Sequence, residues 1–385
     1  MPEADDISKW AVVACDQFTS QPSYWEEVGE FVGESPSAYR LILPEARLKD
    51  DNSESISQIN SAMNEYLSQN IFTEYKNAFV YVEREMIDGS IRRGIVGVID
   101  LEEYDYRPDT KPMIRATEQT VKERIPPRKI IRANSPLELS HVILLCDDEK
   151  HEIIEPLRFA KHSMPKLYDF DLMMDGGHIQ GWLVRGDSRR ALNTRIESYI
   201  KRKSREYSLV FAVGDGNHSL AAAKACYEDG ITSRYAMAEL ENIYDDAIKF
   251  EPIHRIVKGV DFDSFIRDVK ENICTGGDSW PVRFYSRGKK GTIRISKSKG
   301  VSALAVLQNY LDDKGCVIDY IHDIDALRTL SDDEGNIGFE LPEFDGDAKR
   351  NFFREISESG VLPRKAFSMG HATEKRYYLE ARKIQ

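Results

Sequence analysis

The chain has 385 residues, of which 41% are hydrophobic and 31% charged, and this is enough for two domains or one large core with an insertion. Its net charge is −12, from 53 basic and 65 acidic side chains. Because such a chain repels phosphodiester backbones, we expect no broad nucleic-acid binding and rank DNA binding lowest among the candidate functions.

Cysteine usage and hydropathy indicate in which cellular compartment the protein is expected. The five cysteines are far apart in the sequence and form no Cys-x-x-Cys pair, which argues against a disulfide framework and against structural zinc. We find no apolar run before a cleavage site and no apolar stretch long enough to span a bilayer. We therefore expect a cytoplasmic protein without a membrane segment.

The first third of the chain predicts a strand, two helices and a hairpin. The run "WAVVACDQF" (10–18) predicts a buried strand that ends in a loop. Residues 22–32 and 56–72 have the apolar spacing of helices. The two alternating runs around Asp88-Gly89 predict a hairpin with a type I′ turn.

A basic segment follows, in which the Pro126-Pro127 pair is expected to end any helix. Residues 139–148 then predict a strand rich in branched side chains. The run 168–187 predicts a second hairpin, which turns at Asp175-Gly176-Gly177, and residues 188–207 predict a basic amphipathic helix.

Polar residues crowd the next strand-to-helix corner, in "SLVFAVGDGNHSLAAAKACYE" (208–228). Glycine permits close backbone approach, and the first N–H groups of the following helix are unpaired and carry a partial positive charge. We therefore predict an anion site at this corner. Its members are Gly214, Asp215, Gly216, Asn217, His218 and Ser219. The simple alternative is that Asn217 or Asp215 only caps the helix.

Two further clusters carry candidate chemistry. In "IRATEQT", Arg115 offers a fork for a carboxylate or phosphate, and Glu118 is a candidate base. The alternative is an exposed helix start capped by Thr117 and Thr120. In "EPIHRIVKG", His254 and Arg255 interrupt an apolar run, where a histidine can also be an ordinary hydrogen-bonded core residue.

The rest of the chain has a different character. Residues 261–273 predict a helix, and "WPVRFYS" and "GTIRISKS" predict a hairpin across a Gly-Lys-Lys-Gly turn. Strands and helices are mixed and hairpins are frequent, so the fold class is α+β or mixed α/β, not a doubly wound parallel sheet. We expect a main domain at 1–260, a smaller α/β unit at 261–345 and a C-terminal return onto the main domain at 346–385.

In this order, the clusters resemble the Domain of Unknown Function 1015 family. Its members typically show a His-Glu-x-Thr segment, an Asp-Gly…Trp hairpin, a strand ending in Asp-Gly-His-His-Arg and a Pro-Thr-His-Arg strand. The matching segments here are Thr117-Glu118-Gln119-Thr120, the hairpin from Asp175 to Trp182, Asp215-Gly216-Asn217-His218-Ser219 and Pro252-Ile253-His254-Arg255. Three departures are Thr117 and Asn217, each in place of a histidine, and Ser219 in place of the arginine.

The family's Asp-Gly-His-His-Arg motif is similar to one of the ParB and sulfiredoxin-like superfamily, where such a corner holds nucleotide phosphates. Some ParB-like relatives phosphorylate free L-serine. The resemblance therefore implies a ParB-like core and a small-molecule phosphotransferase, with an ATP-dependent free L-serine kinase as the first choice. ATP and Mg²⁺ are the cofactors it implies. The alternative is a non-catalytic ParB-like nucleotide-binding module.

The resemblance to a small-molecule phosphotransferase implies a role for each candidate residue. The phosphates are expected over Gly214, Gly216, Asn217 and Ser219. Glu118 is the expected base with His218 as its competitor, and Asp215 is expected to orient the histidine, bind a metal or take a proton. The expected substrate-binding residues are Arg115, Thr120, His254 and Arg255, with Arg115 or Arg255 holding the carboxylate of the acceptor.

Overall fold

The computed structural model of the chain describes residues 1–2, 6–49, 51–107, 110–274, 279–296, 303–342, 346–363 and 365–384. The chain divides into two compact units. Unit 1 comprises Met1–Ala116, Thr120–Ile248 and Gly370–Gln385, and unit 2 comprises Thr117–Gln119 and Lys249–Met369. Helices, mixed sheets and antiparallel sheets occur together, which confirms the predicted mixed α/β class.

Unit 1 is built on a mixed sheet with the strand order β3-β4-β9-β6-β10-β2-β1-β8-β7. Its strands are β1 Phe79–Glu85, β2 Ile91–Asp100, β3 Tyr104–Asp105, β4 Ile114–Ala116, β6 Ile143–Cys146, β7 Lys166–Asp171, β8 His178–Val184, β9 Phe211–Asp215 and β10 Tyr235–Asn242. The β1–β2 and β7–β8 pairs are the two predicted hairpins. β9 lies between parallel β4 and antiparallel β6.

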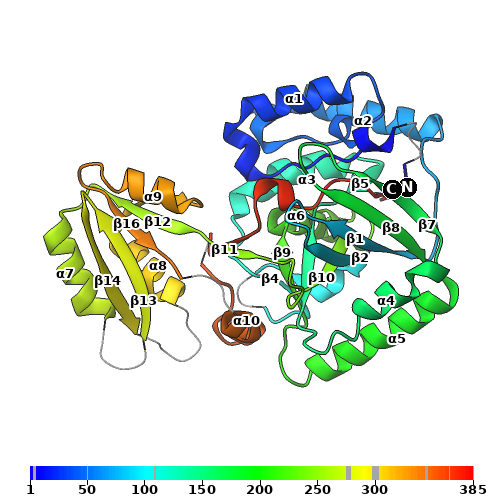
Figure 1. The fold of residues 1–385 in the computed structure, drawn as a ribbon. Helices are drawn as coiled ribbons and strands as arrows, with labels where there is room; N and C mark the ends of the chain where they lie inside the picture. Colours follow the sequence, from blue (N-terminus) through cyan, green and yellow to red (C-terminus); the bar gives the residue numbers. More distant parts are fainter. Residues whose placement is uncertain are drawn as a thin grey trace. The chain divides into compact units, whose positions relative to one another are not determined.

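Helices cover both faces of this sheet (Figure 1). One face packs against α1 Pro22–Val32 and α2 Ser53–Ser68, and the other packs against α4 Glu155–Ala160, α5 Gly186–Lys203 and α6 Asn217–Glu228. α3 Ile125–Ala133 packs on α6. A small pair, β5 Leu137–Leu139 with β18 Ala381–Lys383, joins the C-terminal segment to unit 1.

Unit 2 has an antiparallel sheet with the strand order β14-β13-β16-β12-β15. The strands are β12 His254–Lys258, β13 Ser279–Ser286, β14 Lys289–Ser296, β15 Val317–Ile321 and β16 Ile337–Glu340. Its helices are α7 Phe262–Ile273, α8 Ala303–Asp313, α9 Ile324–Leu330 and α10 Gly346–Ser359. A second pair joins β11 Phe250–Pro252 to β17 Phe367–Met369.

The division between the units differs from the expected boundaries. Unit 2 begins at Lys249, before the predicted end of the main domain at 260, because β12 pairs with β15 and β16 of the second sheet. Residues 346–369 also belong to unit 2, and only the segment from Gly370 returns to unit 1.

Two local predictions are wrong. Trp10, Val12 and Val13 are buried as expected, but the segment forms only an isolated bridge between Val12 and Tyr378. Pro126 and Pro127 do not end a helix; they lie in the first turn of α3, where the N–H that proline lacks would be unpaired anyway.

The turns of the β1–β2 and β13–β14 hairpins also differ in detail from the prediction. At the β1–β2 turn Gly89 has a positive φ (79°) but Asp88 does not, so the turn is not type I′. The β13–β14 hairpin turns at Arg287-Gly288, both with positive φ (43° and 73°), and not across Gly-Lys-Lys-Gly. That pair has the conformation of a type I′ turn.

Two global expectations can be compared with the described residues. None of their helices combines the length and the apolar character that crossing a membrane would require. All five cysteines are among the described residues, and each has a free thiol.

Candidate functional site

The predicted corner is the junction between β9 and α6 in unit 1. Gly216 separates the two elements and has a left-handed conformation, with φ of 83°. A Cβ at this position would lie 3.0 Å from the Cα of Val142 and 2.9 Å from its Cγ2. Only glycine fits this turn without strain, because L-residues with a side chain rarely adopt such a φ and Val142 leaves no room.

The first turn of α6 has no side-chain cap within the described residues. The first intrahelical bond runs from the Leu220 N–H to the Gly216 carbonyl, so the amides of Asn217 to Ser219 precede the helix's own ladder. Residues 214–219 are all half-buried and in contact with solvent. The alternative in which Asn217 or Asp215 merely caps the helix is therefore wrong.

Gly214 has a local structural role. In the β6–β9 pairing, Ile143 faces Asp215 and Leu144 faces Val213, so Gly214 is the extra residue of a β-bulge. Bulges redirect the end of a strand, and glycine tolerates them well. This arrangement explains Gly214 without a phosphate, whose binding at this residue stays a prediction.

Asp215 is held from two sides. Its Oδ1 accepts the Gly216 N–H at 2.8 Å. The Nζ of Lys375 lies 3.6 Å from its Oδ2. Lys375 comes from the C-terminal segment of unit 1 and is 9% exposed. Water therefore screens its interaction with groups at the corner less than it would at the surface.

A histidine that sequence reasoning missed lies beside the corner. His141 immediately precedes β6; its Nδ1 lies 2.6 Å from the Tyr378 hydroxyl and its Nε2 lies 3.5 Å from Ser219 Oγ. Burial lowers the pKa of His141, Asp215 opposes this shift, and Arg128, Arg376 and Lys375 reinforce it. The imidazole is therefore neutral near pH 7, and a neutral imidazole can accept a proton.

His218 is used differently from the predicted base. Its Nε2 accepts the Val121 N–H at 3.1 Å, so in the neutral imidazole the proton is on Nδ1. The nitrogen that would accept a proton is already occupied. The other role that a histidine can have at this corner is that of a phosphate donor, and Nδ1–H would then be the donating group. The bond to Val121 also ties the segment after Thr120 to the start of α6.

Arg115 and Thr120 are both buried, at 4% and 8% exposure. Arg115 lies in β4 and donates from Nη2 to the Thr110 carbonyl at 2.5 Å. The segment after β4 is extended and not helical, so the alternative of a helix start capped by Thr117 and Thr120 is wrong. The two residues stay predictions as substrate ligands.

Glu118 belongs to unit 2, where its carboxylate binds a backbone loop. Oε2 accepts the Lys365 N–H at 3.1 Å, and Oε1 accepts the Ala366 N–H at 3.0 Å. Burial raises the pKa of Glu118, and the backbone donors oppose that shift. The Phe367 backbone is a third donor to this carboxylate, and the role of Glu118 as a base stays a prediction. Arg364, which precedes Lys365, lies outside the described residues.

Arg255 and His254 are core residues of unit 2. The fully buried guanidinium of Arg255 donates to Gln308 Oε1 and to the Lys365 carbonyl, both at 2.9 Å, and it lies over the ring of Tyr320. His254 accepts the Leu341 N–H through Nδ1 at 3.2 Å. These contacts match the structural alternative for His254 and leave Arg255 little capacity to hold a ligand.

The structure thus brings together residues that the sequence analysis did not connect. Within unit 1, Asp215 pairs with Lys375, and Ser219 and Tyr378 both lie beside His141. His218 contacts the Val121 backbone, whereas Glu118, His254 and Arg255 belong to unit 2. The missed residues have weak signals: a histidine just before an apolar strand and the "EKRYY" segment near the C-terminus. Nothing local indicates that these two segments meet.

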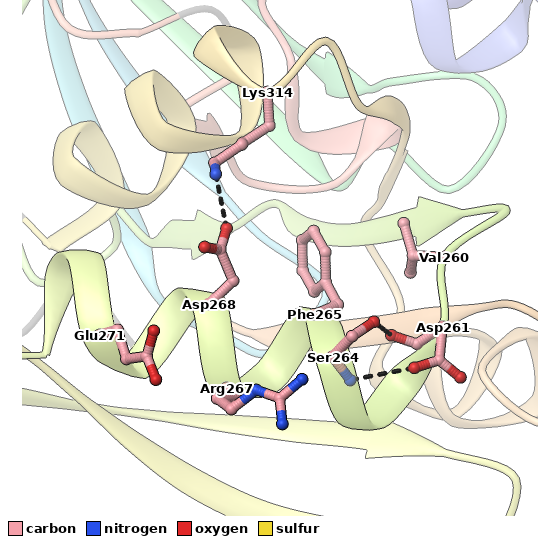
Figure 2. A pocket seen from close by; sticks show the side chains of 8 residues that line it. All are labelled: Val260, Asp261, Ser264, Phe265, Arg267, Asp268, Glu271 and Lys314. Carbon is pink, nitrogen blue, oxygen red and sulfur yellow. Dashed lines mark hydrogen bonds and ion pairs between the residues drawn. The ribbon is translucent and has the colours of Figure 1, made fainter.

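A shallow hollow of about 480 Å³ lies along α7 in unit 2 (Figure 2). Its charged side chains are largely paired: Asp268 accepts from Tyr310 and pairs with Lys314, and Asp261 caps α7 at Ser264. None of the predicted site residues lines it. Among the described residues there is also no group of three or more His, Cys, Asp or Glu side chains placed to hold a metal.

A comparison with models of known protein families found a match over nearly the whole chain. The model of the family described as "Protein of unknown function (DUF1015)" matches residues 2–383. A comparison with curated proteins found no match.

Several solved structures show a remote likeness. SbnI with a C-terminal truncation, from Staphylococcus aureus, is 7% identical with a TM-score of 0.40, over 74% of this chain and 86% of that chain. A free serine kinase variant in complex with ADP is 10% identical with a TM-score of 0.39, over 75% and 92%. A conserved hypothetical protein from Pyrococcus furiosus is 10% identical with a TM-score of 0.33, over 73% and 90%. At these values the likeness carries no argument about chemistry.

Proposed function

This chain belongs to the DUF1015 family, and from that premise we propose that it is a small-molecule phosphotransferase that binds a nucleoside triphosphate at the β9–α6 corner. Its acceptor is a hydroxyl compound, with free L-serine as the first candidate. The proposal does not depend on the ParB-like superfamily assignment, which stays a prediction.

One observation carries the proposal: the first turn of α6 has no side-chain cap among the residues that the structure describes, and it lies in contact with solvent beside a buried lysine. Uncapped amides at a helix N-terminus favour anions, and phosphate is the commonest anion bound in this way. Lys375 adds a full charge 3.6 Å from Asp215. A triphosphate satisfies both features.

The positive charges nearby compensate for the arginine that Ser219 replaces. Lys375 and Arg128 both act electrostatically on His141, which neighbours Ser219. The backbone N–H groups of Asn217 and Ser219 are the proposed phosphate donors, with His218 Nδ1–H as a further donor. Because Arg255 and Arg115 are buried among their own partners, we leave the residue that holds the acceptor's carboxylate open.

Mg²⁺ and ATP are part of the proposal. Magnesium ions are usually held by one or two carboxylates together with the phosphates of the substrate, so a single acid suffices. Asp215 is the acid at the corner, and each of its oxygens keeps an acceptor position beyond the contacts described above. The ion would neutralise charge on the phosphates.

A direct experiment incubates the purified chain with L-serine, ATP and Mg²⁺ and measures O-phosphoserine by mass spectrometry. We expect product, and we expect Asp215→Asn to abolish it while the variant still folds. Glu118→Gln and His218→Ala test the two predicted bases, and normal turnover in both would remove both from the mechanism. A panel of other hydroxyl acceptors covers a wrong choice of substrate.

The same preparation tests the non-catalytic alternative. A rise in melting temperature with ATP, without product from any acceptor, would indicate a nucleotide-binding module and contradict the phosphotransferase. If ATP and other nucleotides change neither the melting temperature nor any substrate, the corner does not bind nucleotides and both functions are wrong.

A further inference from the structure

Ser219 has the surroundings of an activated nucleophile. Its Oγ lies 3.5 Å from His141 Nε2, and the Tyr378 hydroxyl lies 2.6 Å from the other ring nitrogen of His141. A hydroxyl, an imidazole and a group that orients the imidazole form the general pattern of nucleophilic catalysis. Bonds of this kind are often long in the free protein and tighten when substrate binds.

The backbone fixes all three side chains. Ser219 is in the first turn of α6, His141 is held between the Ser140 turn and β6, and Tyr378 donates its N–H to the Val12 carbonyl. With the His141 proton on Nδ1, the Tyr378 oxygen accepts it and Nε2 is left to accept the Ser219 proton. Tyr378 is therefore a positioning residue for His141.

The environment also stabilises a phosphate on Ser219. Ser219 is the third residue of α6, where the partial positive charge of the helix is greatest. Phosphoserine at a helix N-terminus or opposite basic side chains gains charge-assisted hydrogen bonds. Lys375 supplies a positive charge at this corner, where its Nζ lies 3.6 Å from Oδ2 of Asp215.

We propose that Ser219 is itself a phosphoryl acceptor, so that the chain forms a phosphoserine from the nucleoside triphosphate at its own corner. This inference rests on the proposed function, because it needs the triphosphate there. Ser219 Oγ bonds to the terminal phosphorus as the bond to the β–γ bridging oxygen breaks. The hydroxyl proton passes to His141 Nε2, and the nucleoside diphosphate leaves with the electron pair.

The experiment incubates the full chain with ATP and Mg²⁺ and no acceptor, then measures intact mass and maps phosphopeptides. We expect one added phosphate, located at Ser219. Ser219→Ala should abolish it, and His141→Gln should slow it about a hundredfold. Ser204→Ala, at the exposed C-terminal end of α5, is the control and should be modified as fast as the unaltered chain.

Thermal unfolding with and without ATP separates the two proposals. An unmodified chain that ATP still stabilises, or a Ser219→Ala chain that still gains the phosphate, would overturn this inference and leave the phosphotransferase intact. A chain that ATP neither stabilises nor modifies would overturn both. Melting curves of each variant without ATP show that it is folded.

The role of Tyr378 has its own readout in the pH dependence of Ser219 phosphorylation. The charged groups that act on His141 are Asp215, Arg128, Arg376 and Lys375. Tyr378→Phe removes the oxygen that accepts the Nδ1 proton, so the imidazolium loses a partner and the midpoint of the pH profile should move to lower pH. A slower reaction with an unmoved midpoint would show that Tyr378 does not act through His141.

Discussion

At the scale of single residues, Lys375 adds a positive charge to the corner, where it pairs with Asp215. Its side chain is nearly buried beside Asp215, where the effective dielectric constant is lower than at the surface. Its charge therefore interacts more strongly with a bound anion than the charge of an exposed lysine would. From the sequence, the helix N-terminus and the Arg115 to Arg132 segment were expected to compensate for the missing arginine, and Arg128 of that segment acts electrostatically on His141 beside the corner. The lysine was not foreseen because it is 160 residues from Asp215 in the sequence.

Replacing this lysine should weaken nucleotide binding. We expect Lys375→Met to raise the Kd for ATP about tenfold or more, because a charge-assisted bond to phosphate contributes about 1.5–3 kcal/mol. Lys383→Met, at an exposed position of β18, is the matched control and should bind as the unaltered chain does. Isothermal titration calorimetry measures both, and equal affinities would contradict the assigned role.

Glu241 shows a second consequence of burial. It is fully buried in β10, and its oxygens accept no hydrogen bond within the described residues, although Arg92 Nε lies 3.2 Å from Oε1. Burial raises the pKa of Glu241 from 4.5 to about 8, which the attraction of Arg92 only partly offsets. The folded chain therefore keeps a proton that the unfolded chain has released over this pH range.

The free energy of unfolding should accordingly fall as pH rises from about 4.5 to about 8, because the unfolded state binds fewer protons there. We expect Glu241→Gln to remove this loss and to be more stable than the unaltered chain above pH 8, by on the order of a few kcal/mol. Below pH 4.5 the two should differ little. Urea unfolding measured at several pH values tests this. The free energy of unfolding of Glu241→Gln should no longer fall with pH, whereas that of the exposed-site control Glu197→Gln should fall as it does in the unaltered chain.

At the scale of elements, the corner depends on one glycine. Gly216 has a positive φ of 83° and touches Val142, whereas Gly230, after the end of α6, has a φ of 70° and open space around it. Alanine at either position adds the cost of a left-handed residue, about 1–2 kcal/mol. At Gly216 it must also displace the backbone of Val142.

We therefore expect Gly216→Ala to destabilise the chain more than Gly230→Ala and to weaken ATP binding, since the start of α6 shifts. Gly230→Ala should lower stability by about 1–2 kcal/mol and leave binding unchanged. Chemical denaturation and calorimetry on both variants check this pair. Equal losses of stability would mean that Val142 yields without cost.

Helices and hairpins were readable from the sequence where the periodic pattern was long. α1, α5, α6 and the two hairpins of unit 1 follow their apolar spacing. The turns were not, because an Asp-Gly pair fits several turn types and only the backbone decides which residues take positive φ. Pro126 and Pro127 stop a helix or start one depending on where the helix begins, which depends on the packing of α3 on α6.

At the scale of the whole molecule, the chain passes between the units four times, at Ala116, Gln119, Ile248 and Met369. This connectivity limited what the sequence could predict. The corner at Asp215 is local in sequence and was foreseen, whereas His141, Tyr378 and Lys375 reach it only through long-range folding. Glu118 could not be assigned to a unit from the sequence, because the chain segments on both sides of Thr117–Gln119 belong to unit 1.

Each unit has its own apolar core, and this gives the last prediction. Leu307 is fully buried in the core of unit 2 among Val269, Val282 and Phe339. Leu307→Ala should lower the stability of unit 2 by about 2–5 kcal/mol, because it leaves a cavity among close-packed side chains. Leu330→Ala, at a 39% exposed position of the same unit, is the control and should cost far less.

If the cores unfold separately, calorimetry of Leu307→Ala should show one transition moved to lower temperature and another in place. The β9–α6 corner belongs to unit 1, so ATP should still raise the temperature of the unmoved transition. A single transition that moves as a whole would show that the two cores unfold together. A destabilising substitution anywhere in unit 2 would then also unfold the β9–α6 corner. The stability of Glu118→Gln would therefore have to be measured before a loss of its activity is attributed to the loss of a base.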